Sequence, residues 1–493
     1  MRNDEHVLVA GSGIAGLGAA LALGGGTRRV TILDRDPAPP AGSAEDAFYD
    51  WERRGATQLR HSHAFLGRLT SLIRDRYPDL MEELLAQGTR LFGFLDGLPP
   101  RLAKDYAPVP GDEDLKLLFS RRTTLELVLR RYAARLPGVE FVTDAGVRGL
   151  LTHREGALVS VDGLKVERNG AIEDMRGDVV VDASGRNTLF PDWLRAEGVV
   201  VREEASPCGI LYYTRHYRLR DGQDEPPRDG TPGGADLGYI KFGVFVADNR
   251  HFSVTLAVPE IETQLRTAIV RPETFDAACM AIPGAARWID PQRAEPVSRV
   301  FAMGELQNVW RHYLKSGEPQ VLNVFALGDA AIRTNPLYGR GCSSGVVEAH
   351  LLRATLDASG DPIVRARQYE RDLTEAIRPY YDSMVQLDLQ AIRRAAHERN
   401  PNYRPSYRAR MAKSFTEEAL MPAQRGDIEV SRALSRAFHM LDEPTAFLKR
   451  PAIMVRIMAH WAMTKREKER RGLYPPKAGP DRAGMLALLK IAA

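Results

Sequence analysis

Short apolar runs near the start of the chain alternate with segments of small residues. Residues 7–10 are apolar, as are residues 30–33 apart from Thr31, and the segment between them is rich in glycine and alanine. This order predicts a strand, a tight turn, a helix and a second strand, which together form a buried β-α-β unit. Two further apolar runs, residues 179–181 and 321–327, read as strands, and a helix is expected over about 342–356.

The middle of the chain has a different pattern. Residues 209–218, 238–246 and 252–258 alternate in the manner of antiparallel strands. The stretch 221–234 is rich in Gly, Pro and Asp and is expected to be a loop. From about residue 361 onwards the pattern is helical.

The first turn carries a dinucleotide-binding fingerprint. Gly11 permits the tight turn, Gly13 lets the backbone approach a pyrophosphate, and Gly16 lets the helix pack on the strand. Asp34, at the end of the second strand, is placed to accept hydrogen bonds from a ribose diol. The neighbouring cofactor-binding candidates are Ser12, Ala15 and Arg35.

A second glycine segment follows the strand that ends at Leu327. Gly328 permits close backbone approach, and Asp329 is placed to hold a polyol. A Pro/Gly loop from Pro336 to Gly341 then leads into a helix, whose N-terminus attracts negative charge such as that of a reduced flavin. The candidates in this loop and helix are Pro336, Gly339, Gly341, Cys342 and Ser343. Cys342 at a helix N-terminus leaves open an acidified thiol, although a backbone contact is preferred.

Together these motifs resemble the para-hydroxybenzoate-hydroxylase-like FAD-dependent monooxygenases. The resemblance implies that Asp329 binds the ribityl chain, that Pro336 lies beside the isoalloxazine, and that Arg340 is close to the flavin. Residues 179–186, with Asp182, resemble the middle motif of the superfamily in its Asp-Ala-Ser-Gly form. Arg122 matches the arginine that neutralises the pyrophosphate, with the adjacent Arg121 as the alternative. Val147 matches the strand residue that meets the adenine.

A further stretch, Gln58 to Leu66, resembles a Gln-x-Arg-His-x-His-x-x-Leu signature of a bacterial subfamily that includes polyene epoxidases. Leu59 departs from the glycine usual in this signature, and Arg340 departs from the glutamine that is commoner in the subfamily's downstream Asn-Pro-x-Tyr-Gly-x-Gly motif. His61 and His63 have no further ligand at a recognisable spacing, so no metal site is expected.

The resemblance implies an α/β fold (α+β overall). In it a Rossmann-like FAD-binding domain is interleaved with an antiparallel-sheet substrate domain and followed by a helical C-terminal region. The expected ranges are 1–200 and 301–360 for the two FAD-binding parts, 201–300 for the substrate domain and 361–493 for the helical region.

The expected activity is that of an FAD-dependent monooxygenase. The resemblance implies that a flavin C4a-hydroperoxide delivers oxygen from O₂ to a C=C bond or an electron-rich ring. Because the chain has no second Gly-x-Gly-x-x-Gly, electrons are expected from transient NAD(P)H binding or from a separate flavin reductase. A reductase or desaturase of isoprenoid-like chains is the main alternative. A halogenase, which would need a Trp-x-Trp-x-x-Pro stretch absent here, and a non-catalytic flavin-binding protein are weaker alternatives.

The alternating middle region predicts the character of the substrate. Its aromatic residues would form an apolar wall, so the expected substrate is a hydrophobic isoprenoid, polyene or polyketide-like molecule. Arg215 is the one candidate for a fork that would hold a charged substrate, although the alternation could also turn it to solvent. The substrate-contact candidates are Tyr212, Arg215, Tyr239, Phe242 and Phe245.

Composition narrows the class of protein. The net charge is +4 over 493 residues, and acidic and basic residues are interspersed. The charge pattern therefore gives no indication of nucleic-acid binding. Three scattered cysteines favour a reducing compartment, and the apolar start reads as a buried unit rather than a leader, so a cytoplasmic protein is expected. The apolar run 452–463, followed by basic residues, is expected to pack on the substrate domain, with contact to a membrane surface as the alternative.

Overall fold

A computed structural model describes residues 5–56, 58–400 and 402–491 of the chain. Its centre is a five-stranded parallel sheet with the strand order β21-β9-β1-β2-β5. The chain supplies these strands from places far apart in sequence, as the separated motifs predict. Their bounds are β1 His6–Ala10, β2 Arg29–Leu33, β5 Val139–Val142, β9 Val179–Asp182 and β21 Val324–Ala326.

Three helices pack around this sheet and form the largest core. They are α1 (Ile14–Leu23), α7 (Arg122–Ala133) and α12 (Gly341–Ala358), and α1 lies directly against α12. Helix α1 is buried nearly all round, which explains why its sequence is apolar on every face. The apolar start of the chain is therefore core, as expected.

The apolar run 321–327 is not one continuous strand. It divides into β20 (Val321–Leu322) and β21, with Asn323 between them at a φ of 61°. Asparagine is one of the few non-glycine residues that adopt this left-handed conformation readily. The break lets β20 pair with a second sheet, whose other strands are β6 (Ala145–Glu155), β7 (Leu158–Arg168) and β8 (Ala171–Arg176).

The predicted alternating segments form an antiparallel sheet. Its main strands are β11 (Ile210–Leu219), β13 (Lys241–Val246) and β14 (His251–Pro259), with β14 in the middle. The smaller members are β12 Gly234–Asp236, β15 Ala294–Pro296 and β16 Phe301–Met303. Helices α9 Thr263–Ala268, α10 Pro272–Met280 and α11 Pro283–Ile289 follow β14 in the chain.

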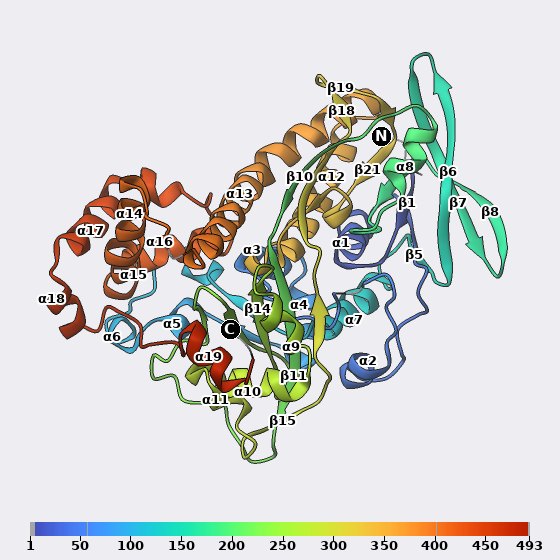
Figure 1. Ribbon diagram of the computed structural model, residues 1–493. Helices are drawn as coiled ribbons and strands as arrows, with labels where there is room; N and C mark the ends of the chain where they lie inside the picture. The colour runs from blue at the N-terminus through green and yellow to red at the C-terminus, as the bar shows by residue number, and fades with distance from the viewer. Residues whose placement is uncertain (1–4, 57, 401, 492–493) are drawn as a thin grey trace.

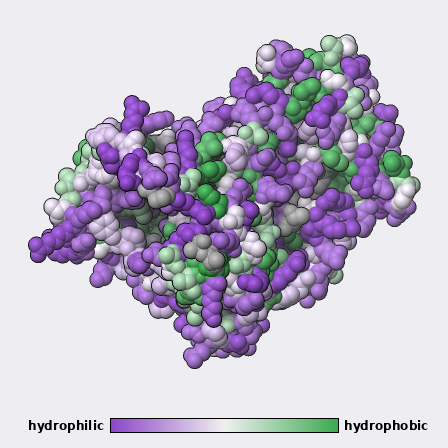
Figure 2. All heavy atoms as spheres, viewed as in Figure 1, coloured by the Kyte–Doolittle hydropathy of each residue, from purple (hydrophilic) through white to green (hydrophobic). Residues whose placement is uncertain are grey.

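A long helix, α13 (Pro362–Glu398), connects the sheets to a helical lobe. Figure 1 shows it running from the upper part of the molecule to the C-terminal helices. Figure 2 shows that polar side chains cover most of this face and that apolar ones gather near its middle. The C-terminal elements are α14 Tyr407–Ser414, the π-helix η4 Phe415–Leu420, α15 Met421–Gly426, α16 Ile428–Phe438, η5 Ala446–Lys449, α17 Pro451–Ala462, α18 Lys465–Arg470 and α19 Arg482–Leu488.

The apolar run 452–463 becomes helix α17. It buries Ile453 and Ile457 in the core of the C-terminal lobe rather than against the substrate domain, while Val455 and Met458 remain exposed. Among the described residues, no helix combines the length and the apolar character that crossing a bilayer requires.

The remaining elements connect these layers. Between β2 and β5 lie α2 Ala44–Asp50, α3 Gly67–Arg76, α4 Pro78–Ala86, β3 Arg90–Phe92, α5 Phe94–Gly97, α6 Pro100–Ala103, η1 Asp112–Asp114 and β4 Leu117–Phe119. The others are α8 Phe190–Ala196, β10 Arg202–Pro207, β17 Gln307–His312, β18 Leu314–Lys315, β19 Glu318–Pro319, η2 Gly328–Ala330, β22 Ile332–Arg333 and η3 Pro336–Tyr338.

Candidate functional site

One cavity of about 640 Å³ joins the two main sheets. It begins at the carboxyl ends of β1 and β2, at Ala10 and Leu33, and reaches the face of the antiparallel sheet at Phe242. Ligands of open α/β sheets bind at the carboxyl ends of the strands, and this volume is typical of small-molecule sites. We therefore take this cavity as the candidate active site.

Two helix N-termini open onto the cavity at its sheet end. Neither α1, which follows Gly13, nor α12, which begins at Gly341, has a side-chain cap or an acidic residue in its first turn. Both glycines line the cavity, and a Cβ added at either would meet nothing within 4 Å. Each end thus combines unpaired N–H groups with open space, which suits the phosphates and the anionic ring of a dinucleotide.

Gly11 and Gly16 are glycines for a different reason. Gly11 has a φ of 105°, and a Cβ there would lie 2.5 Å from the Ala183 carbonyl oxygen. A Cβ at Gly16 would lie 1.9 Å from the Gly11 carbonyl oxygen. Gly16 therefore closes the strand-helix contact, as its place in the motif predicts, and does not itself line the cavity.

Asp34 lies on the cavity wall inside a network of charges. Its carboxylate accepts from the Ser12 hydroxyl and from the Asp36 backbone N–H at 3.0 Å. Arg53 approaches it at 3.4 Å, and Arg130 donates to the Ser12 hydroxyl at 2.9 Å. These contacts fix the carboxylate at the cavity edge, where an oxygen lone pair remains for a ribose hydroxyl.

Arg122, rather than Arg121, faces the cavity. The Arg121 guanidinium turns away and donates to buried Asp248 at 2.7 and 3.0 Å. Arg122 donates to Glu126 at 2.6 Å and to the Nε2 atom of His63 at 3.0 Å. Burial alone would lower the pKa of Arg122, but Glu126, together with Cys342 and Asp329, more than offsets it, so the pKa is raised.

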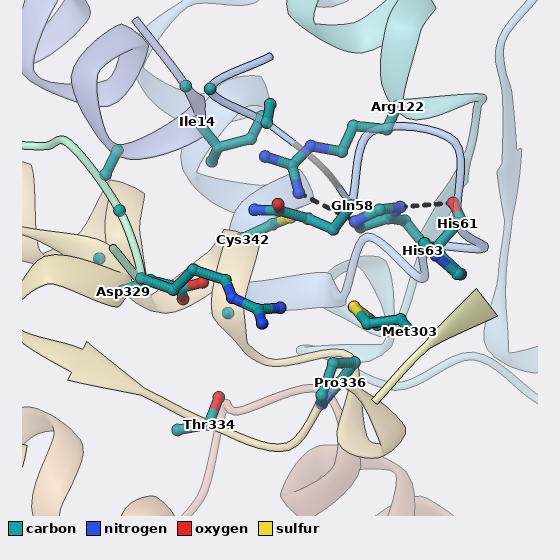
Figure 3. Close-up of a pocket in the computed structure, with 18 of the residues that line it drawn as sticks. Ile14, Gln58, His61, His63, Arg122, Met303, Asp329, Thr334, Pro336 and Cys342 are labelled. Carbon is teal, nitrogen blue, oxygen red and sulfur yellow. Dashed lines mark hydrogen bonds between the residues drawn. The ribbon is translucent and has the colours of Figure 1, made fainter. Parts of the chain in front are cut away.

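The contact with Arg122 fixes the tautomer of His63. Arginine can only donate, so Nε2 of His63 accepts and its proton lies on Nδ1, which donates to the His61 carbonyl at 2.8 Å. Burial, and then Arg122, hold the pKa of His63 well below its usual range, so this ring is neutral. Figure 3 shows Arg122, Gln58 and His63 on one side of the cavity and Pro336 on the opposite side.

Asp329 lies on the cavity wall beside the start of α12. None of the described residues makes a hydrogen bond to its carboxylate, so both oxygens remain for a ligand. Burial raises its pKa, and Arg122 is the largest of the charges that oppose this shift. The turn that carries Asp329 is anchored to α12, because the Gly328 backbone N–H donates to Glu348 at 2.5 Å.

The far end of the cavity is apolar and aromatic. Phe242 and Phe245 of β13 and Tyr212 of β11 line it, as predicted, together with Met303 of β16. Within the described residues, the one lysine on its wall is Lys241, whose ammonium donates to Asp236 at 2.7 Å.

Two predicted substrate contacts are wrong. Arg215 lies outside the cavity, where it donates to Asp276 and to the Ser298 carbonyl. Tyr239 belongs to the core beneath the antiparallel sheet, and its hydroxyl donates to the Pro480 carbonyl at 3.0 Å. Arg215 is therefore not placed to hold a charged substrate in the cavity.

Three predicted flavin contacts also lie off the cavity wall. The Asp182 carboxylate is fully buried and accepts from Ser184 and Thr188, so it shapes the turn at 183–186 that lines the cavity instead. Arg340 points to α13, where it donates to the Tyr380 carbonyl at 3.3 Å. Ser343 is buried inside α12.

Cys342 lines the cavity but is not acidified. Burial raises the pKa of its thiol to about 11, and the neighbouring Arg122 offsets only part of that shift. The alternative of a reactive thiolate is therefore wrong. The other predicted cavity residues, Ser12, Ala15, Arg35, Val147 and Gly339, all lie on the wall.

Several cavity residues were not anticipated. Arg186 follows directly after the predicted Asp-Ala-Ser-Gly turn, so its position in the motif was the available signal. Arg53, Met303 and Phe438 come from segments without a motif, and only the folded chain brings them to the cavity. No group of three potential metal ligands occurs in the part of the chain that the structure describes.

Comparison with known proteins agrees with this geometry. No family model matches the chain. It is 26% identical over 383 residues to Protein Rv3254 of Mycobacterium tuberculosis, covering 72% of this chain and 73% of that protein. It is 27% identical over 231 residues to the FAD-dependent monooxygenase OpS4 of Beauveria bassiana, covering 46% of this chain and 47% of that protein.

Solved structures extend the similarity to almost the whole chain. The flavin-dependent brominase Bmp2 superposes with a TM-score of 0.59 at 16% identity, covering 95% of this chain and 100% of Bmp2. The anhydrotetracycline hydroxylase OxyS of Streptomyces rimosus gives a TM-score of 0.55 at 18% identity, covering 89% of this chain and 76% of OxyS. The predicted resemblance is confirmed at the level of fold: this chain has the fold of the flavin-dependent brominase Bmp2 and of the hydroxylase OxyS.

Proposed function

We propose that this chain is an FAD-dependent monooxygenase that oxygenates a hydrophobic small molecule. The observation that carries the proposal is one continuous cavity, which has dinucleotide-binding features at one end and an aromatic wall at the other. The monooxygenase OpS4 and the hydroxylase OxyS support the same chemistry by similarity.

The residues present fit FAD rather than a mononucleotide. Asp34, with Ser12 beside it, would hold the ribose of the ADP half, and the open N-terminus of α1 would face the pyrophosphate. At the other end, the unpaired oxygens of Asp329 would hold the ribityl chain, and the N-terminus of α12 would stabilise negative charge on the ring. Bound there, the cofactor would supply the redox chemistry with O₂.

The protein's own part is to orient the substrate and exclude water. Phe242, Phe245 and Met303 offer apolar surface, and the Tyr212 hydroxyl is already committed to Asn335. This lining favours isoprenoid, polyene or polyketide-like molecules, in which a C=C bond or an electron-rich ring would be oxygenated. Electrons would come from NAD(P)H bound transiently or from a partner flavin reductase, because the sequence has no second dinucleotide fingerprint.

A halogenase is the second candidate, because the brominase Bmp2 has the same fold. The sequence of this chain has no Trp-x-Trp-x-x-Pro stretch, and the lysine on the cavity wall is paired with Asp236. These two features favour oxygen transfer over halogenation.

The test uses the full chain loaded with FAD and an NADH-driven flavin reductase. We expect tighter binding of FAD than of FMN, and product from polyene or polycyclic aromatic probes but not from small benzoates. Bromide should leave the product mass unchanged. A brominated product would establish the halogenase. Reduction of the probe without O₂ would establish the reductase, and loss of two hydrogens from the probe to oxidised FAD would establish the desaturase.

A further inference from the structure

A buried carboxylate on α13 holds the loop that carries Pro336. Asp388 is only 2% exposed and makes no ion pair with any described residue. It accepts instead from the Asn308 and Asn335 side-chain amides, each at 2.8 Å, and from the Tyr338 hydroxyl at 2.9 Å. A buried carboxylate held only by neutral donors depends on all of them for its stability.

The two asparagines cannot rotate to serve other partners. The Asn335 amide oxygen accepts from the Tyr212 hydroxyl and from the Leu337 N–H at 3.1 Å, so its NH₂ group must face Asp388. The Asn308 amide oxygen accepts from the Asn335 backbone N–H at 2.8 Å, which orients its NH₂ group to Asp388 as well. Both amide donors are thus aimed at the carboxylate by hydrogen bonds to their own amide oxygens.

This network connects the two ends of the cavity. Pro336 and Tyr338 lie in the loop beside the start of α12, and Tyr212 lies on the aromatic wall. The carboxylate itself does not line the cavity. Arg340 ties the same loop to α13 a second time through the Tyr380 carbonyl.

We propose that Asp388 is a positioning residue that fixes the Asn335–Tyr338 loop relative to Tyr212, and so sets the distance between the flavin ring and the substrate. This inference rests on the proposed function for the identity of the two ligands. The loop geometry and its dependence on Asp388 follow from the hydrogen bonds alone.

The decisive variant is Asp388→Asn. It keeps the shape of the side chain but places an NH₂ donor opposite the amide donors of Asn308 and Asn335, which cannot rotate. We expect FAD affinity within about threefold of the parent, because the end of the cavity at Asp34 is untouched. The visible flavin spectrum should change, and the share of reducing equivalents lost as hydrogen peroxide should rise at least fivefold. A parent-like spectrum and parent-like coupling in this variant would overturn the proposal.

A compensating exchange separates positioning from general damage. The double variant Asp388→Asn/Asn335→Asp exchanges the carboxylate and the amide between the two positions. The carboxylate at position 335 still faces the Tyr212 hydroxyl and the Leu337 N–H. We expect it to recover at least half of the lost coupling and the parent spectrum. A double variant no better than Asp388→Asn would contradict the assigned network.

The matched control is Asp276→Asn. Asp276 is also a carboxylate that accepts from a tyrosine, Tyr217, but it lies off the cavity. This change should lower Tm and leave the flavin spectrum as in the parent. If Asp388→Asn shows no cooperative unfolding, it is not folded well enough to test the proposal, and Asn308→Ser takes its place in the spectral measurement. An unchanged flavin spectrum in Asn308→Ser then overturns the proposal.

The spectral readout also keeps the two proposals apart. A parent protein that binds FAD but uses no O₂ with any probe refutes the proposed function. The effect of Asp388→Asn on the flavin spectrum then still decides the positioning role.

Discussion

Glu348 is a single residue on which the cofactor end of the cavity depends. It is fully buried in α12, and one carboxyl oxygen accepts from the Gly328 N–H directly beside Asp329. Burial is the main cause that raises its pKa to about 8, and the nearby Asp329 charge adds to the shift. At neutral pH this side chain is therefore mostly a neutral acid rather than a second anion next to Asp329.

This shift predicts a pH dependence of stability. From its ordinary pKa near 4.5 up to about 8, the unfolded chain has lost the Glu348 proton while the folded chain keeps it. The folded state binds more protons in that window, so stability falls as pH rises, by at most about 1.4 kcal/mol per pH unit from this group. Glu348→Gln keeps the acceptor for Gly328 and removes the proton.

We expect Tm to fall less steeply between pH 5.5 and 8 in Glu348→Gln than in the parent. Thermal unfolding at several pH values, without added cofactor, measures both slopes. Equal slopes would show that Glu348 is ionised in the folded protein.

At the scale of the element, the site consists of two helix starts that face one cavity. Their glycines look alike in sequence but have different surroundings. Gly341 has open space around its Cβ position, whereas Gly16 would place a Cβ 1.9 Å from the Gly11 carbonyl oxygen. A side chain added at Gly341 should therefore impair cofactor binding, whereas one added at Gly16 should impair folding.

We expect Gly341→Val to keep a parent-like Tm without cofactor and to weaken FAD binding at least tenfold, which is about 1.4 kcal/mol. Gly16→Ala should lower Tm sharply. Thermal unfolding and fluorescence titration with FAD separate the two effects. Parent-like FAD affinity in Gly341→Val would mean that the loop and α12 do not approach the cofactor.

The motifs were predictable because each is local in sequence. Gly11, Asp34 and Asp329 act through turns that short stretches specify, and all lie on the cavity wall. The direction of a side chain on a strand was not predictable, because strand alternation gives two faces without saying which is inside. Tyr212 faces the cavity while Arg215 lies outside it, and both belong to β11.

Contacts between distant segments could not be predicted from the sequence either. Asp388 lies far along the chain from Asn308 and Tyr212, within a helix whose pattern shows only an ordinary amphipathic surface. Arg340 reads as part of the flavin motif, yet its guanidinium is used to attach the loop to α13. Tertiary packing decides which polar residues of a motif face a ligand.

At the scale of the whole molecule, the C-terminal lobe takes part in the cavity. Phe438, at the end of α16, lies on the cavity wall although it is 47% exposed. The lobe is attached nearby, since the Gly67 N–H of α3 donates to the His439 ring at 2.8 Å. The lobe therefore contributes to the cavity wall rather than standing apart from the site.

Phe438→Ala tests this role. We expect apolar probes to bind about fivefold more weakly, a loss of roughly 1 kcal/mol for a half-exposed aromatic ring, with FAD affinity unchanged. Leu448→Ala, an exposed residue of the same lobe away from the cavity, is the control. Equal effects of the two changes on probe binding, measured by equilibrium titration, would remove Phe438 from the substrate end.

The central claim is that the chain transfers oxygen from O₂ to an apolar substrate with FAD. The most direct measurement is turnover of a converted probe under ¹⁸O₂ in ordinary water, followed by mass spectrometry of the product. We expect one ¹⁸O atom in each product molecule and no product without O₂. Product that forms anaerobically, or that carries no ¹⁸O, would contradict this claim.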